Sequence, residues 1–92
     1  MKVTIIGAGN MGGAIARGLA KGTIIGESDI TVSDPSEKML QQLQQEYPQM
    51  TVMTDNRAAV SEADFVIVAV KPWLMKTVLA ELPLQSQQVL VS

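Results

Sequence analysis

The chain has 92 residues, of which 47% are hydrophobic and 17% are charged, a composition typical of one small globular domain rather than a disordered segment. Its formal net charge is −2 and it has no basic cluster, so nothing indicates a surface for nucleic acids or anionic membranes. Cysteine and histidine are both absent, which excludes disulfides, thiolate metal ligands and a histidine general base.

The first predicted elements are a strand and a helix. Val3–Ile6 is a short apolar run rich in β-branched residues, which is typical of a strand covered on both faces. The helix that follows is predicted to end near Lys21 and Gly22. Its apolar positions recur at the spacing of one helix face: Met11, Ala14, Ile15, Gly18 and Leu19.

A second strand and a second helix are predicted next. Asp29–Ser33 has the apolar centre of a strand. The letters "DPSE" then predict a helix start, with Asp34 as the N-cap and Pro35 at the first helical position. The glutamines of this helix fit its solvated face, and its apolar face consists of Met39, Leu40, Leu43 and Tyr47.

The third and fourth strands are separated by a short helix. Thr51–Met53 is the third strand, and Asn56 can cap a helix that runs through Val60. Phe65–Val70 is apolar throughout, which predicts a fourth strand that is buried on both faces.

The last elements complete a regular alternation of strands and helices. Pro72 begins a helix that ends before Pro83, and Val89–Val91 begins a fifth strand. The apolar positions of the helix that begins at Pro72 are Leu74, Met75, Val78, Leu79 and Leu82. Because parallel strands need crossover connections, this βαβαβαβαβ pattern predicts an α/β fold of the Rossmann type. We expect a parallel sheet with strand order 3-2-1-4-5 and helices on both faces.

The glycine-rich stretch after the first strand is the strongest functional motif. Gly7, Gly9 and Gly12 have the spacing G-x-G-x-x-G between a buried strand and a helix. Gly7 would permit the tight turn, Gly9 the approach of a pyrophosphate, and Gly12 close packing of the helix on the sheet. The alternative is a purely structural turn, and we expect Gly13 and Gly18 to serve packing.

Asp34 has two interpretations. It follows the second strand about 20 residues after the glycine motif, where a carboxylate commonly accepts hydrogen bonds from the adenosine ribose. Its role as a helix N-cap would also explain it. A carboxylate here would repel the 2′-phosphate of NADP, whereas Ser33, Ser36 and Lys38 could donate hydrogen bonds to it. The choice between NAD and NADP therefore stays open.

Three further residues have both a functional and a structural interpretation. Asn56 either borders the adenine side of the site or caps its helix. Lys71, in "AVKP" after the fourth strand, faces phosphate, substrate or solvent. Trp73 is expected to pack against its helix. No carboxylate pair, Ser/His/Asp set or metal-ligand cluster occurs, so we predict no catalytic residue and no metal ligand in this stretch.

Several motifs together resemble the N-terminal domain of the pyrroline-5-carboxylate reductase family, and the resemblance covers essentially the whole chain. They are "IGAGNMGGAIARGL" at Ile6–Leu19, "SDPSEKM" at Ser33–Met39, "DN" at Asp55-Asn56 and "ADFVIVAVKP" at Ala63–Pro72. The resemblance implies an enzyme of proline biosynthesis that reduces the cyclic imine 1-pyrroline-5-carboxylate to L-proline with NADPH or NADH.

The resemblance also implies a role for each matching residue. Ser33 and Asp34 would lie at the adenosine ribose, and Asn56 would contact the adenosine portion. Ala69, Val70 and Lys71 would line the cofactor towards the nicotinamide. Many relatives have Asn-Arg at the ribose position, and Asp34-Pro35 departs from that pattern. The pyrophosphate would be cradled by Gly7, Ala8, Gly9, Asn10, Met11 and Gly12.

Family members continue beyond the fifth strand into a helical C-terminal domain for substrate binding and dimerisation. We therefore expect residues 1–92 to form an NAD(P)-binding domain that is truncated relative to the full enzyme and inactive alone. Hydride transfer needs donor and acceptor held at near-contact distance, which requires the missing walls. We expect a cytoplasmic protein that binds neither nucleic acid nor membranes, because no apolar run approaches the ~18 residues of a membrane span. We also expect a homo-oligomer, because the fifth strand leaves an apolar edge that can pair with another copy.

Two other functions stay open as alternatives. One is a stand-alone, non-catalytic dinucleotide-binding module. The other is the N-terminal domain of another NADP-dependent oxidoreductase, either a β-hydroxyacid dehydrogenase or an F420-dependent type. The "AVKP" motif argues against this second group.

Overall fold

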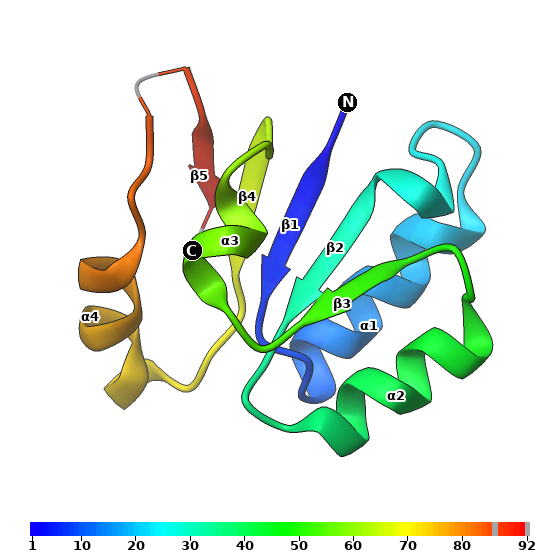
Figure 1. Ribbon diagram of the computed structural model, residues 1–92, viewed down its shortest axis with the longest axis horizontal. Coiled ribbons are helices and arrows are strands. Elements are labelled where there is room, and N and C mark those ends of the chain that lie inside the picture. Colours follow the sequence, from blue (N-terminus) through cyan, green and yellow to red (C-terminus); the bar gives the residue numbers. More distant parts are fainter. Residues whose placement is uncertain (86, 92) are drawn as a thin grey trace.

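The fold is a five-stranded parallel sheet in the order β3-β2-β1-β4-β5 (Figure 1). A computed structural model describes residues 1–85 and 87–91. The predicted strand order and parallel pairing are confirmed. The strands are β1 (Val3–Ile6), β2 (Ile30–Ser33), β3 (Thr51–Met53), β4 (Phe65–Val68) and β5 (Val89–Val91).

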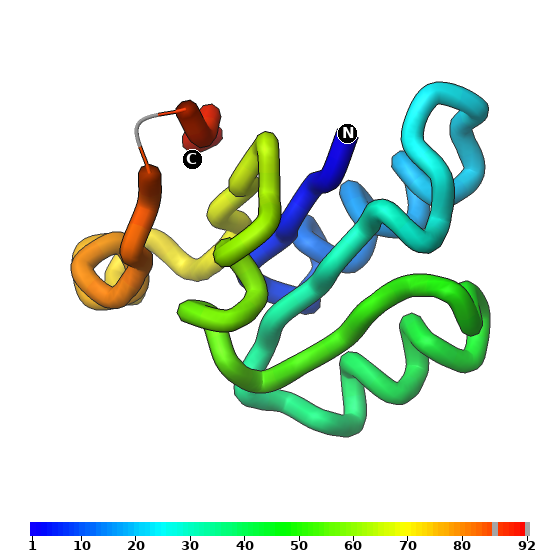
Figure 2. The backbone as a smooth tube through the Cα atoms, turned by 45° about the horizontal axis from the view of Figure 1, so that its top comes forward, coloured from blue at the N-terminus to red at the C-terminus, as the bar shows by residue number. Residues whose placement is uncertain are grey.

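Helices connect successive strands, and a short 3-10 turn, η1 (Glu27–Asp29), precedes β2. Figure 2 shows α2 and α4 on opposite sides of the molecule, with the sheet between them. None of the helices within the described ranges is both long and apolar enough to cross a bilayer. The helices are α1 (Asn10–Lys21), α2 (Glu37–Glu46), α3 (Asn56–Val60) and α4 (Pro72–Glu81).

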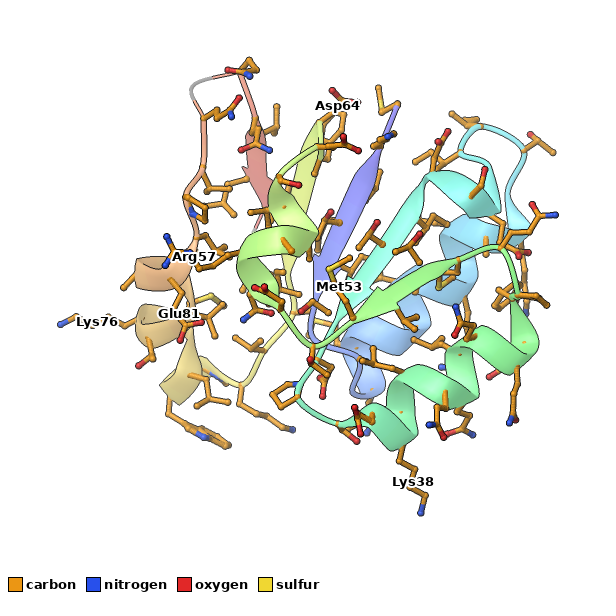
Figure 3. The ribbon with its side chains drawn as sticks, in the orientation of Figure 1. Lys38, Met53, Arg57, Asp64, Lys76 and Glu81 are labelled. Carbon is orange, nitrogen blue, oxygen red and sulfur yellow. The ribbon has the colours of Figure 1, made fainter. Side chains whose placement is uncertain are left out.

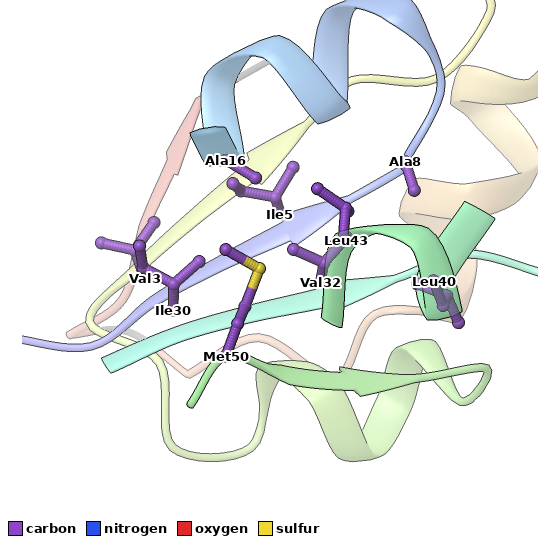
Figure 4. Close-up of a cluster of buried hydrophobic side chains, with 9 residues drawn as sticks. All are labelled: Val3, Ile5, Ala8, Ala16, Ile30, Val32, Leu40, Leu43 and Met50. Atoms are coloured by element: carbon purple, nitrogen blue, oxygen red, sulfur yellow. The ribbon is translucent and has the colours of Figure 1, made fainter. Parts of the chain in front are cut away.

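The two faces of the sheet have separate hydrophobic cores, because side chains alternate along each strand. Val3 and Ile5 of β1 point to the face covered by α1 and α2, whereas Ile6 points to the face of α3 and α4. The first core, drawn in Figure 4, comprises Val3, Ile5, Ala8, Ala16, Ile30, Val32, Leu40, Leu43 and Met50. The second comprises Ile6, Ala59, Val60, Ala63, Val66, Val68 and Leu82. Helices on both faces of the sheet are thus confirmed.

Helix α1 buries a stripe that overlaps only partly with the predicted one, because Ile15 and Leu19 pack against the first core as predicted and the other three positions do not. Met11 is 67% exposed, and Ala14 and Gly18 are exposed as well. The buried residues are Gly12, Gly13 and Ala16. Small side chains on this stripe let the helix backbone approach the sheet closely, so residue size decides the buried face here.

The fourth strand and the tryptophan also differ from expectation. β4 ends at Val68, two residues before the predicted end, because the chain turns away from the sheet after the Ala69 amide donates to the Ile6 carbonyl (2.8 Å). Phe65 and Ile67 are only half-buried, since α1 packs mainly over β1 and β2. Trp73 is 75% exposed, so its predicted packing role is wrong.

Neither predicted helix cap is the residue that caps. The Ser36 hydroxyl accepts from the Met39 amide at the start of α2, where Asp34 was expected. At the start of α3 the cap is Asp55 rather than Asn56, which is the first helical residue. Helix α2 begins two residues later than predicted and α3 one residue earlier, so the Asp34 and Asn56 side chains take part in contacts outside the caps.

The glycines of α1 provide a stability test. A Cβ at Gly12 would lie 2.7 Å from the Gly7 carbonyl carbon, whereas a Cβ at Gly18 would meet nothing within 4 Å. We expect Gly12→Ala to lower the free energy of unfolding by about 1–3 kcal/mol through overpacking. Gly18→Ala should raise it by roughly 0.5–1 kcal/mol, because alanine reduces the entropy of the unfolded chain. Urea unfolding measures the change in the free energy of unfolding for each variant. Equal changes in Gly12→Ala and Gly18→Ala would contradict the conclusion that Gly12, and not Gly18, is required for close packing.

Helices α1 and α2 are joined at the surface by an ion pair. Nη2 of Arg17 lies 2.8 Å from Oε2 of Glu46, and Nε donates to the same carboxylate. These hydrogen bonds, with the guanidinium charge, hold the pKa of Glu46 below its ordinary value of 4.5.

This ion pair predicts a pH-dependent coupling. Because the pKa of Glu46 is lower in the folded chain than in the unfolded chain, the stabilisation is complete above the ordinary carboxyl pKa. It is lost as the pH falls through the lowered value. A double-mutant cycle of Arg17→Ala and Glu46→Ala, followed by urea unfolding, should give a coupling energy at neutral pH that disappears in acid. A coupling that persists in acid would be inconsistent with this ion pair.

Candidate functional site

A groove of about 530 Å³ opens at the carboxyl edge of the sheet. Connections that leave β1, β2, β3 and β4 meet there, as expected for an open parallel sheet. The predicted cofactor-binding residues line it, except for Ala8 and Gly12, which lie in the loop and helix behind it. The predicted residues in the lining are Gly7, Gly9, Asn10, Met11, Ser33, Asp34, Asn56, Ala69, Val70 and Lys71.

Gly7 is required by the backbone of the first turn. It has a φ of +109°, a conformation that side chains with a Cβ rarely adopt. Its amide donates to the Ser33 carbonyl (2.7 Å), and a Cβ would lie 2.6 Å from the Ala69 carbonyl oxygen. The turn out of β1 is therefore fitted between the ends of β2 and β4.

Gly9 differs from Gly7 and Gly12 because the protein's own packing does not require it. A Cβ at Gly9 would meet no atom within 4 Å, and the residue lines the groove. It is also the N-cap of α1 and has no capping side chain. The first-turn amides of a helix have no intrahelical acceptor and carry partial positive charge, so this end of the groove suits an anion.

The Asp34 carboxylate bridges two segments of backbone. Oδ2 accepts from the Ala8 amide and Oδ1 accepts from the Ser36 amide, both at 2.8 Å. Asp34 therefore connects the end of β2 to the glycine-rich turn. Each oxygen keeps capacity for a further hydrogen bond from the groove, because a carboxylate oxygen has two lone pairs.

Asn56 belongs to a short chain of polar groups. The buried Ser33 hydroxyl donates to Oδ1 of Asn56 (2.6 Å), and Nδ2 of Asn56 lies 3.5 Å from Oε2 of Glu81. Glu81 extends from α4 towards α3 (Figure 3). These contacts fix the half-buried amide at the groove wall, on the same side as the end of β2.

The charged residues among those that line the groove are Asp34 and Lys71. Lys71 is exposed at the start of α4, where its carbonyl accepts from the Leu74 amide (2.9 Å). Lys38, a candidate donor to a 2′-phosphate by its sequence position, points away from the body of the molecule (Figure 3). The side of the groove formed by Asp34 is therefore negative rather than positive.

The apolar walls of the groove were missed by sequence reasoning. Met39 is 38% exposed and Leu74 is 45% exposed, although both were predicted on core-facing helix positions. Their periodicity is that of core residues, so no local signal distinguishes them. Only the fold brings the N-terminal part of α2 opposite α4. The additional lining residues are Ile6, Pro35, Met39, Pro72, Leu74 and Val78.

The lining combines an anion-binding helix terminus with apolar walls that suit flat rings. Among residues 1–85 and 87–91, no group of three or more His, Cys, Asp and Glu side chains could hold a metal ion. The open space at Gly9 also fits a pyrophosphate, the group that the glycine motif implies, because a larger residue at this position would fill that space. This chemistry favours binding of a nucleotide-like ligand.

Several relatives of this chain are named as reductases of the same kind. The pyrroline-5-carboxylate reductase of Methanosarcina acetivorans is 41% identical over 81 residues, which cover 88% of this chain and 30% of that protein. The solved structure of a pyrroline-5-carboxylate reductase from Coxiella burnetii has a TM-score of 0.75 at 35% identity, over 84% of this chain and 28% of that one.

A second solved structure is Plasmodium falciparum pyrroline carboxylate reductase with NADP bound. It has a TM-score of 0.81 at 28% identity, and the match covers 98% of this chain and 32% of that chain. The resemblance to pyrroline-5-carboxylate reductases is thus confirmed, and the chain spans about 30% of the length of the first curated relative. A sequence model of the family described as "NADP oxidoreductase coenzyme F420-dependent" matches residues 2–92. The chain therefore belongs to this NADP oxidoreductase family.

Proposed function

We propose that the groove binds a nicotinamide dinucleotide, NADPH or NADH, and that the chain is the cofactor-binding domain of a pyrroline-5-carboxylate reductase. The observation that carries this proposal is the open space at Gly9, beside the uncapped N-terminus of α1. Family membership and the named relatives support the same function.

Each part of the groove has a role in this proposal. The free amides at the start of α1 receive the pyrophosphate, and Asp34 faces the hydroxyls of the adenosine ribose. Asn56, held by Ser33, contacts the adenosine portion. The segment from Ala69 to Lys71 lines the path towards the nicotinamide.

The bound cofactor would supply the hydride, and the residues of this chain would bind and orient it. We assign reduction of 1-pyrroline-5-carboxylate to L-proline to a longer protein, because this chain spans about 30% of the first curated relative. We therefore expect the 92-residue chain to bind the cofactor without turning over the imine.

Gly9→Trp tests the cofactor site. The protein leaves room for a side chain at this position, so we expect the variant to fold and the indole to fill the pyrophosphate space. Titration calorimetry should show NADH and NADPH binding to the natural sequence and a loss of at least about 30-fold, or about 2 kcal/mol, in Gly9→Trp.

Gly18→Trp is the matched control, because Gly18 is exposed on α1, away from the groove lining, and a Cβ there meets nothing. It should bind both cofactors as the natural sequence does. Equal affinity in the two variants, or no saturable binding to the natural sequence, would refute the site.

The negative ribose side predicts a cofactor preference. A 2′-phosphate near Asp34 meets a like charge, so we expect NADH to bind about tenfold more tightly than NADPH at low salt. Asp34→Ser should bring the ratio of the two dissociation constants close to one. The ratio isolates the 2′-phosphate, because both cofactors share the pyrophosphate site. Tighter binding of NADPH by the natural sequence would contradict this placement of the ribose.

A further inference from the structure

The glycine-rich turn is attached to the end of β2 by two adjacent hydrogen bonds. The Gly7 amide donates to the Ser33 carbonyl (2.7 Å), a contact between backbones. The next amide, that of Ala8, donates to a side chain, Oδ2 of Asp34 (2.8 Å). The identity of residue 34 therefore affects the geometry of a turn that lies far from it in sequence.

The Asp34 carboxylate is itself held in place. Its other oxygen accepts from the Ser36 amide at 2.8 Å, so the two oxygens are directed at two different backbone segments. This local turn orients the carboxylate before it meets Ala8. We call this pair of hydrogen bonds, from the Ala8 and Ser36 amides to the Asp34 carboxylate, the brace between β2 and the glycine-rich turn.

On the β2 side, the turn is held by the Gly7–Ser33 backbone contact and by the Asp34 side chain. Ala8 is 7% exposed, and a buried amide without an acceptor is costly. Gly9 provides no capping side chain for α1. The first-turn residues line the groove, and the orientation of their amides therefore depends in part on the contact between Ala8 and Asp34.

We propose that Asp34 is a positioning residue for the phosphate-binding turn, in addition to any contact that it makes with the ribose. The proposal rests on the proposed function, because it takes the turn to be the pyrophosphate site. In this proposal, Asp34 holds the amide of Ala8, and this contact aligns the amides of Gly9, Asn10 and Met11 for an anion.

A charge effect and a positioning effect of Asp34 predict opposite changes in anion affinity when Asp34 is removed, so one measurement distinguishes them. A carboxylate beside an anion site repels the anion, so removal of Asp34 should strengthen anion binding if charge alone mattered. If Asp34 positions the turn, its removal should weaken anion binding despite the loss of a like charge.

The probe is inorganic pyrophosphate, which has no ribose. Dissociation constants from amide chemical shifts are compared for the natural sequence, Asp34→Ala, Asp34→Asn and Glu37→Gln. Glu37 is an exposed carboxylate in the first turn of α2, so its variant removes a nearby charge and leaves the brace intact. Hydrogen exchange at the Ala8 amide is the second readout, because it reports directly on the contact.

We expect Asp34→Ala to weaken pyrophosphate binding at least about fivefold and to accelerate exchange at Ala8. Asp34→Asn keeps one acceptor oxygen and should show intermediate affinity, whereas Glu37→Gln should bind as tightly as the natural sequence or slightly more tightly. If Asp34→Ala does not fold, the asparagine variant carries the test with the same signs.

Unchanged or tighter pyrophosphate binding by the Asp34 variants, or unchanged exchange at Ala8, would overturn the proposal. A natural sequence that binds NADH but not pyrophosphate would overturn it as well and would leave the proposed function standing. Failure to bind either ligand would remove the proposed function and this inference together.

Discussion

The start of α1 lies against the turn that leaves β1, and this close approach is the constraint on which the site depends. A Cβ at Gly12 would lie 2.7 Å from the Gly7 carbonyl carbon, so only glycine lets the helix begin at this position. The approach places the positive end of the helix at the carboxyl edge of the sheet. Gly7 adds the positive φ that the turn needs, between the ends of β2 and β4.

The three glycines of the motif therefore have separable roles. Gly7 and Gly12 are required by the fold, because a Cβ at either position meets backbone atoms. Gly9 is not required by the fold, because a Cβ there meets nothing within 4 Å, and it lines the groove in which we propose that the cofactor binds. The same comparison shows that the predicted packing role of Gly18 is wrong, since it is exposed and a Cβ there meets nothing. Gly13 is buried, as a packing role requires.

The strands and helices follow from local sequence patterns, whereas the contacts of the polar side chains at their ends do not. The segment "DPSE" contains two residues that can cap a helix, and local sequence favoured Asp34. Ser36 caps α2 because the Asp34 carboxylate also accepts from Ala8, a contact that local sequence does not reveal. Similarly, Asp55 caps α3 while Asn56 pairs with Ser33. In both cases a long-range partner decided between neighbouring polar residues.

The sequence by itself determined the strands, the helices, their parallel order and the position of the glycine-rich turn. These features depend on periodicity and on glycine and proline positions within short segments, which single-sequence reasoning can recognise. Only the tertiary structure decided which residues line the groove and what Asp34 and Asn56 contact. Met39 and Leu74 have the spacing of core residues, yet they line opposite walls of the groove because α2 and α4 flank the same edge of the sheet. Such contacts join residues that are distant in sequence, so no local pattern specifies them.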